Sequence, residues 1–290
     1  MSQQSTQSDG MRATGRGTAE APAAIATTPR RGNSATGGST PMRGVFLEIE
    51  NLRVTFDDFV AIDDASLSFY SGDLRFLIGP NGAGKTTLVD AITGLAPAKG
   101  RIEVSGQPIL GTPTHKLARL GIGRTFQNAS VFEELTVEQN MDIASGARRG
   151  WTTLLRRRRG MTSKVRDTLE TVGLSAYADT KAGVLSHGQK QWLEIGMLLV
   201  QDCTVLLLDE PVAGMGKDER QATGRLLQKI AEDHAVIVVE HDMEFMREFA
   251  TSVTVLAQGS VLAEGSVADI QSDPAVREVY LGTAEMENDR

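Results

Sequence analysis

Hydrophobic and polar residues alternate in two neighbouring stretches of the chain, residues 46–56 and 60–69. This period of two predicts two half-buried strands, because successive side chains of a strand point to opposite faces. The pair Asp57-Asp58 between them predicts a turn, since short acidic side chains favour turns. Ordered structure is therefore expected to begin near Val45, with two paired strands.

Farther along the chain, short apolar runs alternate with stretches of helical spacing. Strands buried on both faces are predicted at residues 75–79, 205–209 and 235–240. Helices are predicted at residues 85–95, 217–233 and 267–281. Residues 118–181 are expected to be mainly helical, and residues 252–263 predict a hairpin that turns near Gln258-Gly259-Ser260. Strands that alternate with helices predict an α/β fold with a mostly parallel sheet covered by helices.

The first 43 residues differ from the rest in composition. They are rich in Ser, Thr, Gly, Gln and Ala and contain almost no large apolar side chain. Such a segment buries too little apolar surface to offset its ordering entropy, so it is predicted to be a disordered tail. Five arginines against two acidic residues also fit an organelle transit peptide, but the segment lacks a helical apolar face. Residues 44–290 are expected to form one domain, with a helical subdomain at about 118–181.

Charge and cysteine content narrow the class of protein. The net charge is -7, which argues against nucleic acid as the main partner because phosphate backbones attract basic surfaces. The single cysteine, Cys203, excludes an intrachain disulfide. No stretch reaches the roughly 18 consecutive apolar residues of a membrane-spanning helix. Any role in a membrane process is therefore expected to depend on partner proteins.

One glycine-rich loop has the spacing of a phosphate-binding motif, G-x-x-x-x-G-K-[ST]. Its residues are Gly79, Pro80, Asn81, Gly82, Ala83, Gly84, Lys85, Thr86 and Thr87. Glycines allow backbone N–H groups to surround phosphate oxygens, and the helix that follows presents its positive end to the anion. A lysine can contact the β- and γ-phosphates, and a threonine hydroxyl can ligate Mg²⁺. An unliganded glycine-rich turn is the alternative, but the predicted strand before the loop and the helix after it favour ATP.

A second candidate site follows the apolar run at residues 205–209. Asp209 and Glu210 stand at the carboxyl end of this predicted strand, the edge where open α/β sheets bind ligands. Because successive side chains of a strand diverge, Asp209 can face a metal ion while Glu210 orients and deprotonates an attacking water. Acids that only meet solvent are the alternative, and the phosphate loop makes a shared site the better interpretation.

Further motifs resemble the nucleotide-binding subunit of ABC transporters over about residues 45–281. The sequence LSHGQ is close to the family signature and contains Ser186, His187, Gly188 and Gln189, with Ser186 at the predicted N-cap of a helix. The other matching positions are Gln127, His241 and Phe56. Taken singly, each of these is more often a surface or core residue, but their order along the chain matches the family.

The resemblance implies a role for each motif. The signature would contact the γ-phosphate of ATP bound to the other subunit of a dimer. Gln127 would sense Mg²⁺ and the attacking water, His241 would contact the γ-phosphate, and Phe56 would stack on adenine. The segment from Pro211 to Gly216 occupies the place of a dimer-contacting loop. His187 departs from the commonest signature, which has Gly there, and activity is expected to survive this change.

The residues around these motifs resemble the ATP-binding subunits of importers of urea and of branched-chain amino acids. The run LSHGQKQWLEIGMLL is more similar to the urea branch. This resemblance implies an ATPase on the cytoplasmic face of the membrane, paired with two permeases, a second ABC ATPase and an external binding protein. The solute is expected to be small and nitrogenous, with urea the first candidate and branched-chain amino acids the alternative.

Three other classes of protein remain as rivals. A P-loop kinase is disfavoured by LSHGQ and His241, and a non-transport ABC ATPase by the lack of a tandem cassette or a long coiled-coil insertion. An exporter ATPase stays open, because the core motifs do not encode direction. The basic stretch from Arg148 to Arg159 could meet anionic lipid headgroups or acidic permease loops, although a solvated insertion explains it as well.

Overall fold

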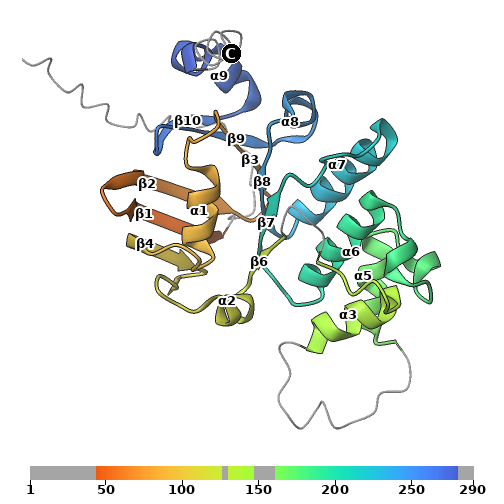
Figure 1. Cartoon of the computed structure of the whole chain (residues 1–290). Helices are drawn as coiled ribbons and strands as arrows, with labels where there is room; N and C mark the ends of the chain where they lie inside the picture. Colours follow the sequence, from red (N-terminus) through yellow and green to blue (C-terminus); the bar gives the residue numbers. More distant parts are fainter. Residues whose placement is uncertain (1–43, 126–129, 147–160, 280–290) are drawn as a thin grey trace, which may run out of the picture. The chain divides into compact units, whose positions relative to one another are not determined.

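The computed structural model describes residues 44–125, 130–146 and 161–279. Contacts divide the chain into Met1–Thr40 and Pro41–Arg290, and all described residues belong to the second unit (Figure 1). The predicted tail, Gln127 and the basic stretch from Arg148 to Arg159 lie outside the described residues. Within the described residues, no helix is both long and apolar enough to cross a bilayer.

The predicted hairpin forms the start of a small antiparallel sheet. Among the described residues, its strands lie in the order β2-β1-β4-β5. They are β1 (Val45–Phe56), β2 (Phe59–Tyr70), β4 (Ala98–Val104) and β5 (Gln107–Pro108). Leu47 and Ile49 are buried, as are Leu52 and Val54 after a register shift in β1, so the period of two predicted this half-buried sheet correctly on either side of the shift.

A larger sheet carries the strands that the apolar runs predicted. In the described part of the chain it has the order β10-β9-β3-β8-β7-β6, with β10 antiparallel to β9 and the other neighbours parallel. Its strands are β3 (Leu74–Ile78), β6 (Ile122–Arg124), β7 (Val205–Asp209), β8 (Ala235–Val239), β9 (Ser252–Ala257) and β10 (Ser260–Gly265). Every residue of β3, β7 and β8 is buried, as expected for strands covered on both faces.

Short helices connect and cover these strands. They are α1 (Lys85–Ile92), α2 (Thr114–Leu120), α3 (Val137–Gly146), α5 (Ser163–Thr171), α6 (His187–Leu199), α7 (Lys217–Ala231), α8 (Met243–Phe249) and α9 (Val267–Ser272). Two 3₁₀ turns, η1 (Ser175–Tyr177) and η2 (Ala182–Val184), precede α6. The helices predicted at residues 85–95 and 217–233 are thus confirmed within a few residues.

Two predictions about helices need correction. The mainly helical stretch 118–181 contains β6 near its start, because Ile122 is buried and pairs with Val205 of β7. The single helix predicted at residues 267–281 is interrupted, because α9 ends at Ser272 and a separate helix occupies residues 274–279. Pro274 starts this second helix, and the Asp273 carboxylate accepts the N–H of Ala275 at 2.8 Å. Proline is well suited to the first position of a helix and cannot continue the preceding one.

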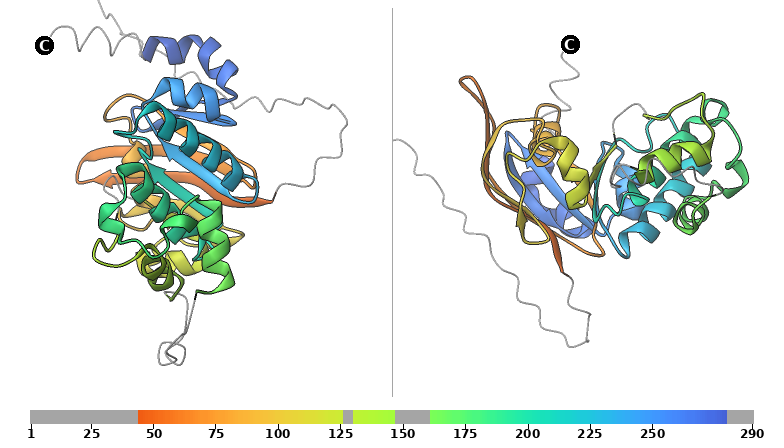
Figure 2. Two further views of the ribbon diagram at one scale, coloured as in Figure 1. Left: turned by 90° about the vertical axis from the view of Figure 1, so that its right-hand side faces the viewer. Right: turned by 90° about the horizontal axis from the view of Figure 1, so that it is seen from below.

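The large sheet separates two apolar clusters. In β7, Leu206 and Leu208 pack with α3, α5, α6, α7 and α8, whereas Val205 and Leu207 pack with α1 and the small sheet. Figure 2 shows the same division, with α1 and the antiparallel strands on one side of the large sheet and the helices α3, α5, α6 and α7 on the other. Because β3, β7 and β8 are parallel, the loops that follow them leave from one edge of the sheet.

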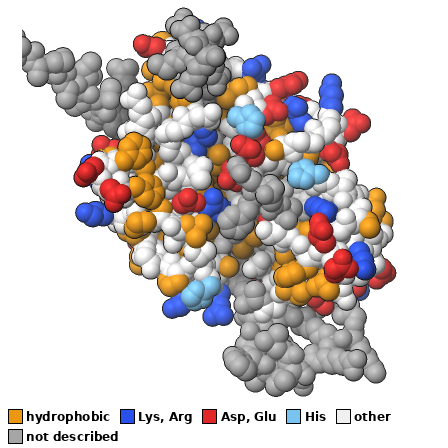
Figure 3. All heavy atoms as spheres, viewed as in Figure 1, with side chains coloured by type: hydrophobic (Ala, Val, Ile, Leu, Met, Phe, Trp, Pro, Cys, Tyr) orange, Lys and Arg blue, Asp and Glu red, His pale blue; other side chains and the backbone are white. Residues whose placement is uncertain are grey.

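The β1–β2 turn exposes aromatic side chains. Phe56 and Phe59 are cross-strand partners at the turn, with exposed fractions of 46% and 65%. Hydrophobic side chains gather on the surface above the small sheet, on the left of the space-filling view (Figure 3). Exposed aromatic rings beside a ligand-binding edge can offer stacking surfaces to planar groups.

Candidate functional site

The glycine-rich loop between β3 and α1 is packed closely against its surroundings. Gly79 has φ 148°, and a Cβ atom there would lie 2.1 Å from the carbonyl oxygen of Leu256. Gly84 is the N-cap of α1, with φ 101° and no side-chain cap. A Cβ atom at Gly84 would lie 2.7 Å from Cδ1 of Ile62. Glycine is thus required at both positions, and the positive end of α1 is left facing the loop.

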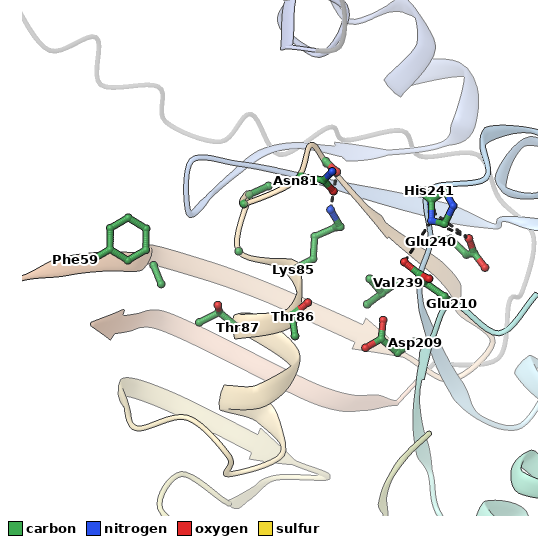
Figure 4. Close-up of a pocket in the computed structure, with 15 residues that line it drawn as sticks. Phe59, Asn81, Lys85, Thr86, Thr87, Asp209, Glu210, Val239, Glu240 and His241 are labelled. Atoms are coloured by element: carbon green, nitrogen blue, oxygen red, sulfur yellow. Dashed lines mark hydrogen bonds and ion pairs between the residues drawn. The ribbon is translucent and has the colours of Figure 1, made fainter. Parts of the chain in front are cut away.

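Lys85 is the cation of this loop. Its Nζ donates to the carbonyl oxygens of Gly79 at 2.6 Å and Pro80 at 3.1 Å (Figure 4). Burial lowers the pKa of Lys85, while the nearby Glu210 and Asp209 carboxylates act in the opposite direction. A partly desolvated ammonium group on a glycine-rich loop suits binding of a phosphate, whose charge would compensate the burial.

Asp209 ends β7 beside a buried arginine. Burial raises the pKa of Asp209, and the positive charge of Arg124 counteracts this effect. The Arg124 guanidinium lies 3.7 Å from Oδ2 of Asp209 and 2.5 Å from Oδ1 of Asp90. Arg124 therefore links the end of β6 to α1 and β7, and it holds the Asp209 carboxylate near the phosphate loop.

Glu210 and His241 meet at the carboxyl ends of β7 and β8. The Nδ1 atom of His241 lies 3.4 Å from Oε1 of Glu210, and the two side chains are 73% and 34% exposed. Glu210 has φ 47°, a strained conformation for a residue with a side chain. Its N–H donates to the carbonyl oxygen of Val239 at 2.9 Å, which fixes the strained residue to β8. Strain of this kind is typical of residues whose direction matters for function.

A cavity of about 440 Å³ brings the predicted residues together (Figure 4). Its lining includes Gly79, Asn81, Gly82, Ala83, Gly84, Lys85, Thr86, Thr87, Asp209, Glu210 and His241. Pro80 is not part of the lining and contributes its carbonyl oxygen to Lys85. In Figure 4 the phosphate loop separates Phe59 on one side from Glu210 and His241 on the other. The cavity thus has an aromatic end and an acidic end, with the lysine between them.

Some predicted residues do not line this cavity. Phe56, which was expected to stack on adenine, is replaced in the lining by Phe59. The turn explains the difference, because β2 begins at Phe59 and runs toward the loop through Ala61, which also lines the cavity. Gln127 lies outside the described residues.

The four signature residues, Ser186 to Gln189, lie at the start of α6 and away from the cavity lining. The predicted N-cap is confirmed, since Ser186 Oγ accepts the N–H of Gln189 at 3.2 Å and the Gln189 side chain accepts the N–H of Ser186. Ser186 Oγ also donates to Glu219 Oε1 at 2.9 Å. His187 is exposed and Gly188 is buried. The phosphate loop and the start of α6, which could both bind an anion, thus lie apart in this chain.

Four lining residues escaped the sequence argument, namely Phe59, Ala61, Val239 and Glu240. Phe59 could have been found as the first aromatic residue after the predicted turn at Asp57-Asp58. Glu240 lies directly before His241 and is 3% exposed in the structure. The sequence predicts it only as the last residue of the strand at 235–240. An acid at the end of an otherwise apolar run was the available signal.

Comparisons with known proteins agree with this geometry. The sequence profile described as "ABC transporter" matches residues 62–213, which include the phosphate loop, the signature and both acids. The chain belongs to the ABC transporter family. A second profile, described as "Branched-chain amino acid ATP-binding cassette transporter", matches residues 260–285.

Named relatives within the ABC transporter family match most of the chain. The high-affinity branched-chain amino acid transport ATP-binding protein BraF of Pseudomonas aeruginosa is 34% identical over 250 residues, with 82% of this chain and 98% of BraF covered. LivG of Escherichia coli strain K12, described in the same words, is 32% identical with the same coverage. The ABC similarity therefore extends well beyond the phosphate loop.

Solved structures of ABC proteins share the fold. An ATP-binding cassette of an ABC transporter, MJ1267, in its ADP conformation has a TM-score of 0.71 and 30% identity, with 83% of this chain and 99% of that chain covered. A nucleotide-free ATP-binding cassette from an ABC transporter has a TM-score of 0.70 and 31% identity, with 82% and 99% covered. The predicted ABC-type P-loop fold is thus confirmed, and this ABC chain is an ATPase.

Proposed function

We propose that this ABC protein is the ATP-hydrolysing subunit of an importer for branched-chain amino acids. The observation that carries the proposal is the similarity to branched-chain amino acid transport ATP-binding proteins over 82% of the chain. The profile match at residues 260–285 adds support, because it lies outside the nucleotide site and belongs to the same transporter group.

The cavity suggests how its residues divide the work of ATP hydrolysis. The loop from Gly79 to Thr87 would surround the phosphates, with Lys85 as the charged contact. Phe59 is better placed than Phe56 to stack on the adenine ring, because it lines the cavity. Glu210 would orient and deprotonate the attacking water, and His241, 3.4 Å from it, would contact the γ-phosphate.

The acidic end of the cavity also fits Mg²⁺. Thr86 and Asp209 both line it and offer oxygen ligands, and Gln127 stays a proposed third contact. Mg²⁺ is usually held by one or two carboxylates together with substrate phosphates and water, so no larger acidic cluster is needed. When bound, Mg²⁺ would neutralise phosphate charge during hydrolysis.

The separation of Ser186 from the cavity favours a dimer. In such a dimer, each phosphate loop would face Ser186, His187, Gly188 and Gln189 of the other subunit. The capped start of α6 presents a helix N-terminus, which suits contact with a phosphate. ATP would then stabilise the closed dimer more than the open one, and hydrolysis would reopen it.

The partners follow from the ABC function. This chain would act at the cytoplasmic face of the membrane with two permease subunits and an external binding protein. A second ABC ATPase would complete a heterodimer, and a homodimer is the alternative. Neither the named relatives nor the matching profiles support urea as the solute, so branched-chain amino acids replace it as the first candidate.

Uptake of labelled leucine tests the proposal. Cells that lack this chain should lose high-affinity leucine uptake, and excess unlabelled urea should not compete with leucine in cells that have it. Wild-type chain should restore uptake, whereas Glu210→Gln should not. Loss of labelled urea uptake with unchanged leucine uptake would instead assign the transporter to urea and leave the ATPase assignment intact.

A further inference from the structure

Glu240 is a buried carboxylate at the point where the loops after β7 and β8 meet. It follows the last residue of β8 and immediately precedes His241, and its side chain is 2% exposed. Figure 4 shows it beside His241, on the side of the cavity where Glu210 lies. None of the roles assigned above uses this residue.

The two carboxylate oxygens of Glu240 serve different loops. Oε1 accepts the N–H of Val212 at 3.4 Å, in the loop that follows Glu210. Oε2 accepts the N–H of His241 at 3.1 Å and that of Asp242 at 3.3 Å. One side chain therefore fixes the backbone on both sides of the contact between Glu210 and His241.

This arrangement is costly for a carboxylate. Burial raises the pKa of Glu240, and the N–H groups of Asp242, His241 and Val212 offset part of that effect. Among the described residues, the ion-pair contact of Glu240 is with His241 Nδ1 at 3.9 Å, which is charged only when protonated. An apolar side chain at this position would leave these backbone N–H groups without acceptors, so the carboxylate holds the two loops together. Its place here points to a role in geometry.

We propose that Glu240 is a positioning residue for ATP hydrolysis, which couples the loop after Glu210 to the backbone of His241. This inference rests on the proposed roles of Glu210 and His241. If the loop after β7 shifts when two subunits close, Glu240 transmits the shift to His241 through the N–H group of Val212. Closure and the placement of His241 then occur together.

Glu240→Gln should break the hydrogen bond to Val212 while keeping those to His241 and Asp242. The amide oxygen can still accept from His241 and Asp242, but the NH₂ group cannot accept from Val212. Glu240→Ala removes all of these hydrogen bonds. Glu232→Gln is the matched control, because Glu232 is an exposed acid beyond the end of α7.

Amide hydrogen exchange on the full chain tests the link directly. Glu240→Gln should speed exchange in a peptide covering residues 211–216 and leave residues 241–242 near wild type. Glu240→Ala should speed exchange in both, and Glu232→Gln in neither. Unchanged exchange at residues 211–216 in both Glu240 variants would overturn the proposal.

Kinetics distinguish positioning from a general loss of structure. Glu240→Gln should lower kcat for ATP hydrolysis on the order of tenfold, while the dissociation constant for ATP stays within about twofold of wild type. Equal kcat in Glu240→Gln, Glu232→Gln and wild type would contradict the inference alone. Absence of hydrolysis by wild type and Glu232→Gln would contradict the proposed function itself, and the positioning role with it.

Discussion

At the scale of single residues, the phosphate loop owes its shape to positions where a side chain has no room. Gly79 and Gly82 both have positive φ angles, but only Gly79 is crowded, with the Leu256 carbonyl oxygen 2.1 Å from a Cβ atom. At Gly82 a Cβ atom would meet nothing within 4 Å. Replacing Gly79 therefore tests steric crowding, whereas replacing Gly82 tests the strain of a positive φ angle alone.

Gly79→Ala should destabilise the protein much more than Gly82→Ala. The backbone of Leu256 in β9 must move for the first, which we expect to cost roughly 3 kcal/mol or more of unfolding free energy. The second carries the strain of a positive φ alone, about 1 kcal/mol. Urea denaturation of both variants measures the difference. Equal losses would mean that the loop yields easily at Gly79.

Asp209 gives a prediction about pH. Because burial raises its pKa, the folded chain binds a proton at Asp209 more tightly than the unfolded chain does. Proton binding at Asp209 therefore adds to the free energy of unfolding. This contribution is complete below the pKa of Asp209 in the unfolded chain and is lost as the pH rises through its pKa in the folded chain. At neutral pH the ionised Asp209 is thus a net cost.

Asp209→Asn should therefore raise Tm at pH 8 and raise it less as the pH is lowered through the folded pKa of Asp209 toward the ordinary pKa of an aspartate, while ATP hydrolysis is lost. Thermal melts across this pH range measure the effect, with the exposed Asp179→Asn as the matched control. A lower Tm for Asp209→Asn at pH 8 would show that attraction to Arg124 outweighs burial.

At the scale of elements, two helices begin in the same way in different places. Ser186 caps α6 and Ser266 caps α9, each in a reciprocal pair with the residue three positions later. Ser186 lies in the signature, whereas Ser266 lies near the end of the described chain. The pair thus offers a built-in control for the function of the signature.

Ser186→Ala and Ser266→Ala should each lower stability by about 1 kcal/mol, since each removes a cap. Only Ser186→Ala should also lower the rate of ATP hydrolysis, by on the order of tenfold. Denaturant titration and a steady-state ATPase assay on the same preparations give both numbers. Equal ATPase rates in the two variants would argue against phosphate contact by Ser186.

The strands and helices also show which parts of the fold can be predicted from one sequence. Strands such as β1 and β7 were predictable because burial of one or both faces leaves a clear pattern of apolar residues. The strand β6 was not, because three residues are too few for a period and its stability comes from pairing with β7. The break at Pro274 was readable from the sequence, but the helical spacing on either side obscured it.

The candidate site divides in the same manner. Lys85, Asp209 and Glu210 could be predicted because motif spacing and strand ends place them at one edge of a parallel sheet, and His241 because its position resembles that of the ABC family. Phe59 and Glu240 could not, since their place in the cavity depends on where a turn ends and on which backbone groups face a buried acid. Motif spacing thus predicted which chemical groups the site contains. Tertiary contacts decided which of the neighbouring residues in the sequence line the cavity.

At the scale of the whole molecule, one chain holds a phosphate loop and a signature that do not share a cavity. If both act on one ATP, they come from different subunits. Two inactive variants, each with one half broken, then complement each other. Lys85→Ala breaks the phosphate loop. Ser186→Asp can still cap α6, because Asp caps as well as Ser, but places a negative charge where phosphate would bind and beside Glu219, which accepts a hydrogen bond from Ser186 Oγ.

A mixture of Lys85→Ala and Ser186→Asp chains should recover about a quarter of the wild-type ATPase rate, although each variant alone is inactive. Half of the randomly formed dimers are mixed, and each mixed dimer contains one intact site and one doubly broken site. The assay is a titration of one variant into the other at constant total protein, with a bell-shaped rate expected. Lys85→Ala mixed with Glu210→Gln is the control. Both changes lie in the phosphate-loop cavity, so each site of a mixed dimer contains one broken cavity and no rate should be recovered. A flat rate for the first pair, in a mixture that ultracentrifugation shows to contain dimers, would mean that Ser186 does not act across the dimer.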